Sequence, residues 1–170
     1  MGITDLNNLG QYFTPANVAE YMANEIISAK PTLRNVLDPC IGENIFFSFL
    51  DNNKIDLQGV EIDDALINDE TKTFFNKSNR NLIIGDFIDQ KFDRQFDAVI
   101  MNPPYTRQEM ISLETKKKLQ TIKNIAGIEM SAKANLYVYF LLKGLFLLKT
   151  NGLLVAITYD SWLYSSFGTN

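Results

Sequence analysis

The chain has 170 residues, of which 46% are hydrophobic, so it can bury one sizeable core and is predicted to form a single domain over residues 1–170. Its formal net charge of −4 argues against a self-sufficient nucleic-acid binder, whose affinity comes from clustered Lys and Arg. One cysteine and no histidine exclude an internal disulfide, Cys/His zinc sites and His-based triads, and we expect no metal. Without a membrane-span-length apolar run or a signal peptide, we expect a cytoplasmic protein with no membrane partner.

Helix-like and strand-like segments alternate along the chain, which predicts an α/β fold with a doubly wound, mostly parallel sheet. Thr14 and Pro15 suit the N-cap and first turn of a helix. The apolar residues expected on one face of this helix are Val18, Tyr21, Met22 and Ile26. The expected strands are residues 35–38, 57–62, 82–84, 96–101 and 153–158.

Three further segments lie between these strands. Asp63 or Asp64 is expected to cap a helix that runs to about Asn76, and residues 135–149 have the length and apolar character of another helix. Residues 106–134 are charged and polar, and we expect a long excursion with one or two helices. An insertion of this length in a compact domain is usually functional or mobile.

The turn after the first strand has the sequence DPCIGEN over residues 38–44. An acid at the end of a strand, followed by a glycine turn into a helix, is how open α/β sheets meet a nucleoside-bearing cofactor. The spacing differs from GxGxxG, because Asn44 and Phe47 stand where glycines would. Asn tolerates left-handed backbone angles better than other non-glycine residues, so we expect the turn to form. Taken alone, Asp38 and Gly42 could equally belong to an ordinary tight turn.

Acids also end the second and third predicted strands. Glu61 follows Asp38 at close to the ~20-residue separation from which an acid reaches ribose hydroxyls. Asp86 could accept a hydrogen bond from an adenine amino group, and Phe87 could stack on the ring. Each acid alone could merely end a strand in solvent. Together with Asp38 they predict one adenosine-shaped cleft.

The fourth predicted strand ends in Asn102, Pro103, Pro104 and Tyr105. Two prolines fix the backbone and remove two amide donors, which leaves the Asn102 side-chain oxygen and the Pro103 carbonyl as a cluster of acceptors. An amino group held between these acceptors would direct its nitrogen lone pair toward an incoming methyl group, and Tyr105 offers a face for a planar substrate. The alternative is a structural Pro-Pro turn with a packed tyrosine.

The Asn102–Tyr105 sequence resembles the NPPY catalytic motif of amino-methyltransferases. Residues 10–15 (GQYFTP) resemble the N-terminal motif of the γ-class DNA adenine methyltransferases. The other segments that continue this resemblance are residues 59–63, 85–87, 135–137, 152–154 and 161–163. It covers nearly the whole chain apart from the polar excursion and is strongest to the type II and type IIG restriction–modification methyltransferases. It implies the Rossmann-like fold of S-adenosylmethionine-dependent methyltransferases, with adenine in DNA as the methylated base.

The resemblance also implies a role for each matching residue. The implied cofactor-binding residues are Thr14 and Tyr12 for the methionine carboxylate end, Asp38 and Gly42 for the methionine and ribose part, Glu61 for the ribose hydroxyls, and Ile62, Asp86 and Phe87 for adenine. The implied catalytic residues are those of the NPPY motif, Asn102, Pro103, Pro104 and Tyr105, with acceptors at Asn102 and Pro103 and a stacking face on Tyr105 for a flipped base. The family loop usually reads DPxxGxG, so Asn44 departs from the family pattern at the methionine end of the pocket.

Three alternatives remain open from the sequence. An NPPY site also serves enzymes that methylate a protein glutamine side chain or adenine in RNA, and a methyltransferase fold can act as a non-catalytic binding subunit. The GQYFTP motif favours the DNA class, and the intact NPPY motif argues against an inactive copy. Cys40 lies in the cofactor loop rather than after the prolines, so we expect a packed residue and no carbon-5 cytosine mechanism.

In this class the grip on double-stranded DNA comes from a C-terminal target-recognition domain. By the family pattern we expect the catalytic domain to be truncated after the fifth strand and the recognition domain to be absent. The apolar strand 153–158 would then become a sheet edge, which invites pairing with another chain. We therefore expect a dimer or self-association through this strand.

Overall fold

The computed structural model describes residues 12–51, 54–106, 114, 117 and 135–159. Its strands are β1 (Asn35–Asp38), β2 (Asp56–Glu61), β3 (Arg80–Ile84), β4 (Phe96–Met101) and β5 (Leu148–Ala156). Its helices are α1 (Ala16–Ala29), α2 (Ile45–Leu50), the 3-10 turn η1 (Asp64–Leu66), α3 (Asp69–Phe75) and α5 (Leu136–Phe146). The prediction that residues 106–134 form one or two helices falls almost entirely outside the described residues.

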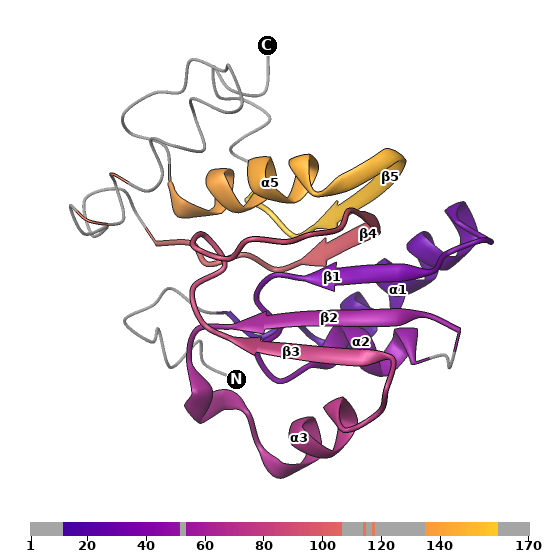
Figure 1. Cartoon of the computed structure of the whole chain (residues 1–170), viewed down its shortest axis with the longest axis horizontal. Coiled ribbons are helices and arrows are strands. Elements are labelled where there is room, and N and C mark those ends of the chain that lie inside the picture. Colours follow the sequence, from indigo (N-terminus) through magenta and orange to yellow (C-terminus); the bar gives the residue numbers. More distant parts are fainter. Residues whose placement is uncertain (1–11, 52–53, 107–113, 115–116, 118–134, 160–170) are drawn as a thin grey trace.

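The five strands form one sheet in the order β3-β2-β1-β4-β5, and every neighbouring pair is parallel (Figure 1). The chain first adds β2 and β3 on one side of β1 and then adds β4 and β5 on the other. The strand order therefore reverses between β1 and β4. In open α/β sheets, ligands bind at such a reversal, outside the carboxyl ends of the strands. The predicted doubly wound parallel sheet is confirmed.

Helices cover both faces of the sheet. On one face α1 and α2 pack through Ala19, Ile26 and Phe47 against strand side chains such as Val36. On the other face α5 packs through Phe140 onto the second core cluster. Because side chains alternate along a strand, consecutive residues of β1 and β4 supply the two clusters in turn. The near-continuous apolar runs of these central strands follow from burial on both faces.

The start of α1 differs from the prediction. Pro15, not Thr14, occupies the N-cap position, with φ −60° and ψ 142°. The Thr14 hydroxyl is instead hydrogen-bonded within the functional site described below. Tyr21 is 64% exposed, so its assignment to the buried face was wrong. The buried stripe of α1 consists of Ala19, Met22, Ala23 and Ile26, because the small alanines let the helix approach the sheet closely.

The helix predicted after β2 is divided in two. Asp63 accepts a hydrogen bond from the Ala65 backbone amide (3.1 Å) and caps η1. Asn68 then accepts from the Thr71 amide (2.8 Å) and caps α3. Asn68 was not identified as a helix cap from the sequence. A new helix begins there because the Asn68 side chain accepts one of the backbone amides that have no partner inside the first turn of α3.

The last strand begins earlier than predicted, at Leu148. Its register with β4 shifts between the pairs Phe96–Leu148 and Ala98–Leu153. Asn151, with φ 62°, accommodates the extra residues in a left-handed conformation. In the described part of the chain, no helix is both long enough and apolar enough to cross a bilayer.

Candidate active site at the carboxyl ends of the strands

The candidate site lies where β1, β2, β3 and β4 end, at the same edge of the parallel sheet. Asp38 is the last residue of β1, Glu61 is the last of β2, and Asn102 directly follows β4. Gly85, directly after β3, donates its backbone amide to the Glu61 carbonyl (2.7 Å). Four chain segments that are distant in sequence are therefore brought to one place by the topology.

The loop between β1 and α2 contains two left-handed residues, Gly42 (φ 51°) and Asn44 (φ 65°). The prediction that Asn44 can replace a glycine in this turn is confirmed. A Cβ atom added at Gly42 would have no neighbouring heavy atom within 4 Å, so the backbone here faces open space. The missing side chain leaves room for a ligand to approach the main chain closely.

Glu61 fastens this loop to the end of β2. The residue is only 3% exposed, and its carboxylate accepts the Gly42 backbone amide at Oε2 and the Asp63 backbone amide at Oε1, each at 2.9 Å. A carboxylate has about four lone-pair sites. The two that remain can accept the hydroxyls of a ribose diol. The role of Glu61 in holding Gly42 was not predicted from the sequence.

Asp38 is a buried carboxyl with one oxygen unused. It is 1% exposed; Oδ1 accepts the Cys40 backbone amide (3.1 Å), and Oδ2 has no hydrogen-bond partner among the described residues. Burial raises the pKa of Asp38 to about 8; the hydrogen bond from Cys40 acts in the opposite direction, and the nearby Glu61 charge adds to the rise. A buried oxygen without a partner suits a ligand that brings a positive charge or a donor.

Replacing Asp38 by asparagine is expected to change how stability depends on pH. An acid whose pKa is raised from 3.8 to about 8 by folding stabilises the folded state below pH ~4, and this stability is lost as the pH rises toward 8. Asp38→Asn should therefore gain stability relative to the wild type as the pH rises from 5 to 8.5, by ~4 kcal/mol at most. Urea denaturation at the two pH values measures the gain. The exposed Glu43→Gln in the same loop is the control, and equal changes in both variants would contradict the prediction.

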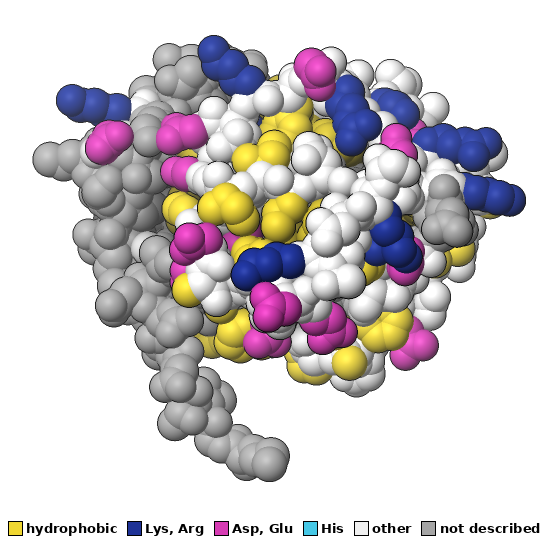
Figure 2. Space-filling view, turned by 60° about the horizontal axis from the view of Figure 1, so that its bottom comes forward, with side chains coloured by type: hydrophobic (Ala, Val, Ile, Leu, Met, Phe, Trp, Pro, Cys, Tyr) yellow, Lys and Arg dark blue, Asp and Glu magenta, His cyan; other side chains and the backbone are white. Residues whose placement is uncertain are grey.

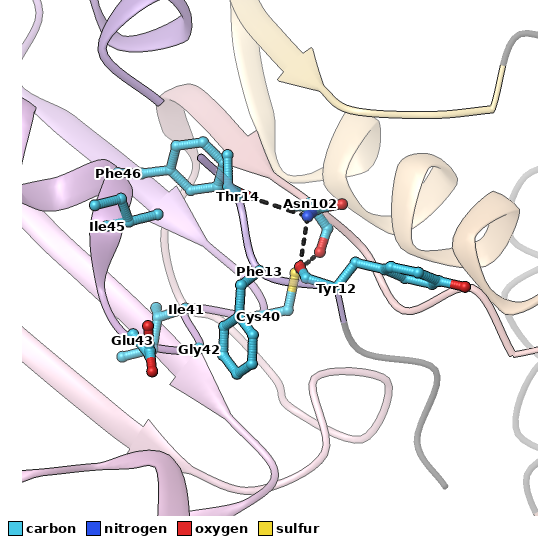
Figure 3. A pocket seen from close by; sticks show the side chains of 10 residues that line it. All are labelled: Tyr12, Phe13, Thr14, Cys40, Ile41, Gly42, Glu43, Ile45, Phe46 and Asn102. Carbon is cyan, nitrogen blue, oxygen red and sulfur yellow. Dashed lines mark hydrogen bonds between the residues drawn. The ribbon is translucent and has the colours of Figure 1, made fainter. Parts of the chain in front are cut away.

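A pocket opens between this loop, the N-terminal segment and the end of β4 (Figure 3). Its lining residues are Tyr12, Phe13, Thr14, Cys40, Ile41, Gly42, Glu43, Ile45, Phe46 and Asn102. The structure thus brings together four residues that the sequence assigned to the cofactor and catalytic sites: Tyr12, Thr14, Gly42 and Asn102. The apolar lining was not predicted. Aromatic and branched residues near the GQYFTP and DPCIGEN motifs were its only sequence signal.

The Asn102 side chain is held by the N-terminal segment (Figure 3). Its amide nitrogen donates to the Tyr12 carbonyl (2.8 Å) and to the Thr14 hydroxyl (3.1 Å). These two contacts fix the orientation of the amide and leave its oxygen, Oδ1, as the acceptor. The Cys40 thiol donates to the Asn102 backbone carbonyl at 3.3 Å. Burial raises the pKa of Cys40 well above its ordinary value, which agrees with a packed thiol rather than a nucleophile.

Tyr105 folds back over Asn102. Its hydroxyl lies 3.1 Å from Asn102 Oδ1 and 2.8 Å from the Ile157 carbonyl, and the two acceptors compete for its single proton. Its ring contacts the rings of Tyr12, Tyr137 and Tyr159, with centroid distances of 5.6, 5.9 and 4.5 Å. Burial, with smaller contributions from these neighbours, raises the pKa of Tyr105 above its ordinary value. The half-buried hydroxyl therefore acts as a neutral hydrogen-bonding group.

The predicted adenine-binding residues take different places. Ile62 is 53% exposed beside Glu61 and is available to a ligand. Asp86 Oδ1 accepts the Ile88 backbone amide (2.9 Å) and closes the turn after β3. Phe87 is 2% exposed, and its ring packs on Phe140 in the core with a centroid distance of 5.1 Å. The expected stacking of the Phe87 ring on adenine is therefore corrected: the ring is core material, because the turn at Asp86 directs it under the sheet edge.

Charge is unevenly distributed between the two ends of the sheet. The acids that end the strands or follow them closely are Asp38, Glu43, Glu61, Asp63, Asp64, Asp86 and Asp89. Basic residues at or before the strand starts include Lys30, Arg34, Lys54, Lys77 and Arg80. In Figure 2, Lys and Arg side chains accordingly reach the right-hand margin, where the strands begin, and Asp and Glu are more frequent toward the left and lower parts. None of the described acids forms a group of three that could hold a metal ion.

Relatives of known class were found by sequence. The chain is 28% identical over 160 residues to the type II methyltransferase M.AccI of Acinetobacter calcoaceticus, covering 93% of this chain and 29% of that protein. It is 29% identical over 154 residues to the type II methyltransferase M.HincII of Haemophilus influenzae, covering 90% and 28%. The chain thus spans less than a third of the length of these relatives.

Solved structures give the same fold. A Listeria monocytogenes protein assigned to the class I S-adenosylmethionine-dependent methyltransferases superposes with a TM-score of 0.76 at 18% identity, over 98% of this chain and 52% of that one. The S-adenosylmethionine-bound CalS10, an amino pentose methyltransferase from Micromonospora echinaspora, has a TM-score of 0.52 at 16% identity, over 89% and 55%. The fold is therefore that of the Rossmann-like S-adenosylmethionine-dependent methyltransferases, as predicted.

The family itself is identified by a match to the model of the Eco57I restriction-modification methylases, which covers residues 20–170. This range includes the loop after β1, the acids Glu61 and Asp86 at or just after the ends of β2 and β3, and the sequence NPPY after β4. The chain belongs to the Eco57I restriction-modification methylase family.

Proposed function

We propose that the protein transfers a methyl group from S-adenosylmethionine to the exocyclic amino group of adenine in DNA, as part of a restriction–modification system. The observation that carries this proposal is the hydrogen bonding of the Asn102 side chain. Its amide nitrogen donates to the Tyr12 carbonyl and the Thr14 hydroxyl, which leaves its oxygen as the acceptor that we propose for the substrate amino group. Family membership and the type II methyltransferase relatives support the coarser part of the proposal, methyl transfer within a restriction–modification system.

The residues at the strand ends fit the cofactor. Gly42 leaves open space beside the main chain, Asp38 has an unpartnered buried oxygen, and Glu61 has lone pairs to spare. The proposed contacts of the remaining cofactor-binding residues are Tyr12 and Thr14 at the methionine end and Ile62 and Asp86 at adenine. S-adenosylmethionine supplies an electrophilic methyl group on a sulfonium, and the protein supplies position and electrostatics.

The NPPY residues then prepare the nucleophile. Asn102 Oδ1 and the Pro103 carbonyl accept the two N–H bonds of the target amino group and point its lone pair away from them, toward the methyl group. Tyr105 stacks on the base. Its hydroxyl loses the hydrogen bond to Asn102 Oδ1 and retains the shorter one to the Ile157 carbonyl. The amine loses its proton after attack, so no general base with a tuned pKa is required.

A DNA substrate needs positive charge that the cleft does not offer. The described residues at the carboxyl edge are mainly acidic, and phosphate contacts normally come from Lys and Arg. We propose that the grip on double-stranded DNA comes from another part of the protein, a target-recognition domain. A duplex base would be flipped into the site at a cost of a few kcal/mol.

Methyl transfer from labelled S-adenosylmethionine tests the proposal directly. The intact natural protein is incubated in parallel with duplex DNA, RNA and protein substrate, and the modified nucleoside or residue is identified by mass spectrometry. N6-methyladenine in DNA is the expected product. Label in RNA adenine or in a protein glutamine would replace this proposal by the corresponding amino-methyltransferase. Tight cofactor binding without transfer to any of them would indicate a non-catalytic subunit.

We further propose that β5 pairs with another chain when this segment is produced alone. β5 lies at one end of the described sheet, and Leu153, Val155 and Ile157 pack against the core from there. An apolar strand at a sheet edge presents unpaired backbone groups to other chains. Light scattering of residues 1–170 is expected to give a dimer or larger species, and Val155→Lys is expected to shift it toward monomer. A wild-type monomer at high concentration would contradict this.

A further inference from the structure

Lys143 lies near the end of α5 and reaches across to the loop that follows β3. Its ammonium nitrogen donates to the backbone carbonyls of Phe87 (2.5 Å), Ile88 (2.9 Å) and Gln90 (2.7 Å). An ammonium group has three donors. All three are therefore used on one short loop, and three carbonyl dipoles converge on one cation.

The half-buried setting makes this contact strong. The Lys143 nitrogen also lies 4.7 Å from the Phe87 ring centroid and 5.9 Å from that of Phe92. Burial lowers the pKa of Lys143 to about 8, and the neighbouring acids Asp86 and Asp89 act in the opposite direction. Without the cation, the converging carbonyls would be left in an apolar surrounding without their shared donor.

The backbone of the loop that carries Asp86 has local hydrogen bonds, and the side chains of Phe87 and Ile88 pack into the second core cluster. Within it, Asp86 Oδ1 accepts the Ile88 amide, the Asp86 carbonyl accepts the Asp89 amide (3.0 Å), and the Phe87 carbonyl accepts the Gln90 amide (3.2 Å). Just before it, Gly85 is tied to the Glu61 carbonyl of β2. Lys143 thus connects the far side of the loop to a helix on the opposite face of the sheet from α1 and α2.

We propose that Lys143 is a positioning residue that fixes the Asp86 loop so that the cofactor's adenine amino group is recognised. This inference rests on the proposed function, because it takes the cofactor as S-adenosylmethionine and Asp86 as the acceptor for its adenine. Lys143 lies in α5, outside the NPPY motif and apart from the acids at the strand ends, and controls recognition of the adenine amino group.

The test compares two ligands that differ only at the recognised group. S-adenosylhomocysteine has the adenine amino group, and its 6-deamino purine analogue has a hydrogen atom in its place. The intact natural protein is expected to bind the adenine ligand at least ~10-fold more tightly in calorimetry, since the Asp86 carboxylate loses its donor when hydrogen replaces the amino group. In Lys143→Met the ratio should fall to within about twofold of unity, mainly through weaker binding of the adenine ligand.

Matched variants separate positioning from general stability. Lys72→Met removes an exposed lysine from α3, and it should leave the ratio unchanged. Lys143→Arg keeps the charge and the donors, and it should retain most of the ratio. If Lys143→Met does not fold, Lys143→Gln, which keeps a shorter neutral donor, should give an intermediate ratio.

The outcomes separate the positioning role of Lys143 from the assignment of Asp86 as the acceptor for adenine. A ratio in Lys143→Met or Lys143→Gln equal to that of the wild type overturns the positioning role and leaves the Asp86 assignment standing. No preference in the wild type overturns both the Asp86 assignment and the positioning role. Failure of the proposed function is read separately, from the absence of methyl transfer to DNA.

Discussion

Replacing Asn102 by alanine is expected to lower kcat for methyl transfer by ~10²–10³-fold, the usual effect of removing one pre-organised hydrogen-bonding group from an active site. The substitution removes the Oδ1 acceptor that is proposed to orient the target amine. It also removes the donor that holds Tyr12 and Thr14, so cofactor affinity should fall as well, by no more than ~10-fold. Single-turnover kinetics and calorimetry on the same samples separate the two effects.

Two further variants, one at Asn102 and one at its hydrogen-bonded neighbour Tyr105, serve as controls. Asn102→Asp keeps acceptor oxygens but loses the donor to the Tyr12 carbonyl, so it should retain more kcat than alanine while weakening the cofactor. Tyr105→Phe removes the hydroxyl from Oδ1 and keeps the ring, and kcat should stay within ~5-fold of the wild type, since a neutral hydrogen bond contributes about 1 kcal/mol. A cofactor loss in Asn102→Ala as large as its kcat loss would contradict a direct role in catalysis.

Replacing Glu61 by glutamine is expected to weaken cofactor binding by ~10–100-fold. Both carboxylate oxygens accept backbone amides, from Gly42 and from Asp63. Glutamine must turn its NH₂ group toward one of these donors, so one charge-assisted bond is lost and one amide is left unpaired. The same change removes negative charge from the position that would accept the ribose hydroxyls.

Asp64→Asn is the matched control for this effect, because Asp64 is an exposed acid three residues along the same segment. Its cofactor Kd should stay within about twofold of the wild type. Titration calorimetry gives the affinity, and thermal unfolding without cofactor reports any loosening of the Gly42 loop. If Glu61→Gln binds as tightly as Asp64→Asn, Glu61 does not contact the cofactor.

Most of the sheet could be predicted because its strands carry short apolar runs that end in polar signals. The span of β4 was predicted at its observed bounds, since a buried parallel strand leaves a continuous apolar run that Asn102 and the prolines terminate. The break between η1 and α3 was not predicted, because Asn68 caps α3 within a segment whose amino-acid composition does not change. Tyr21 was misplaced because a helix face is identified by its large apolar residues, while the small residues Ala19 and Ala23 are the fully buried ones.

The location of the candidate site was predictable from the sequence, but most of its hydrogen bonds were not. Acids at the ends of parallel strands must meet at one edge, so the convergence of Asp38 and Glu61 follows from topology alone. The bond from Gly42 to Glu61, the free oxygen of Asp38 and the contacts of Lys143 depend on tertiary distances that no local pattern encodes. The same limit explains Phe87, whose position after Asp86 does not reveal on which side of the turn its ring lies.

The two hydrogen bonds from the Asn102 amide nitrogen have a consequence for how the two substrates communicate. The segment that they hold lines the cofactor pocket, and the other atom of the same amide is proposed to receive the target base. A ligand that orders Tyr12 and Thr14 therefore also orders Oδ1, and a base that occupies Oδ1 steadies the segment in return. Such linkage is reciprocal by thermodynamic necessity. Cofactor and nucleobase should therefore raise each other's affinity by the same factor, because both act on the side-chain amide of Asn102.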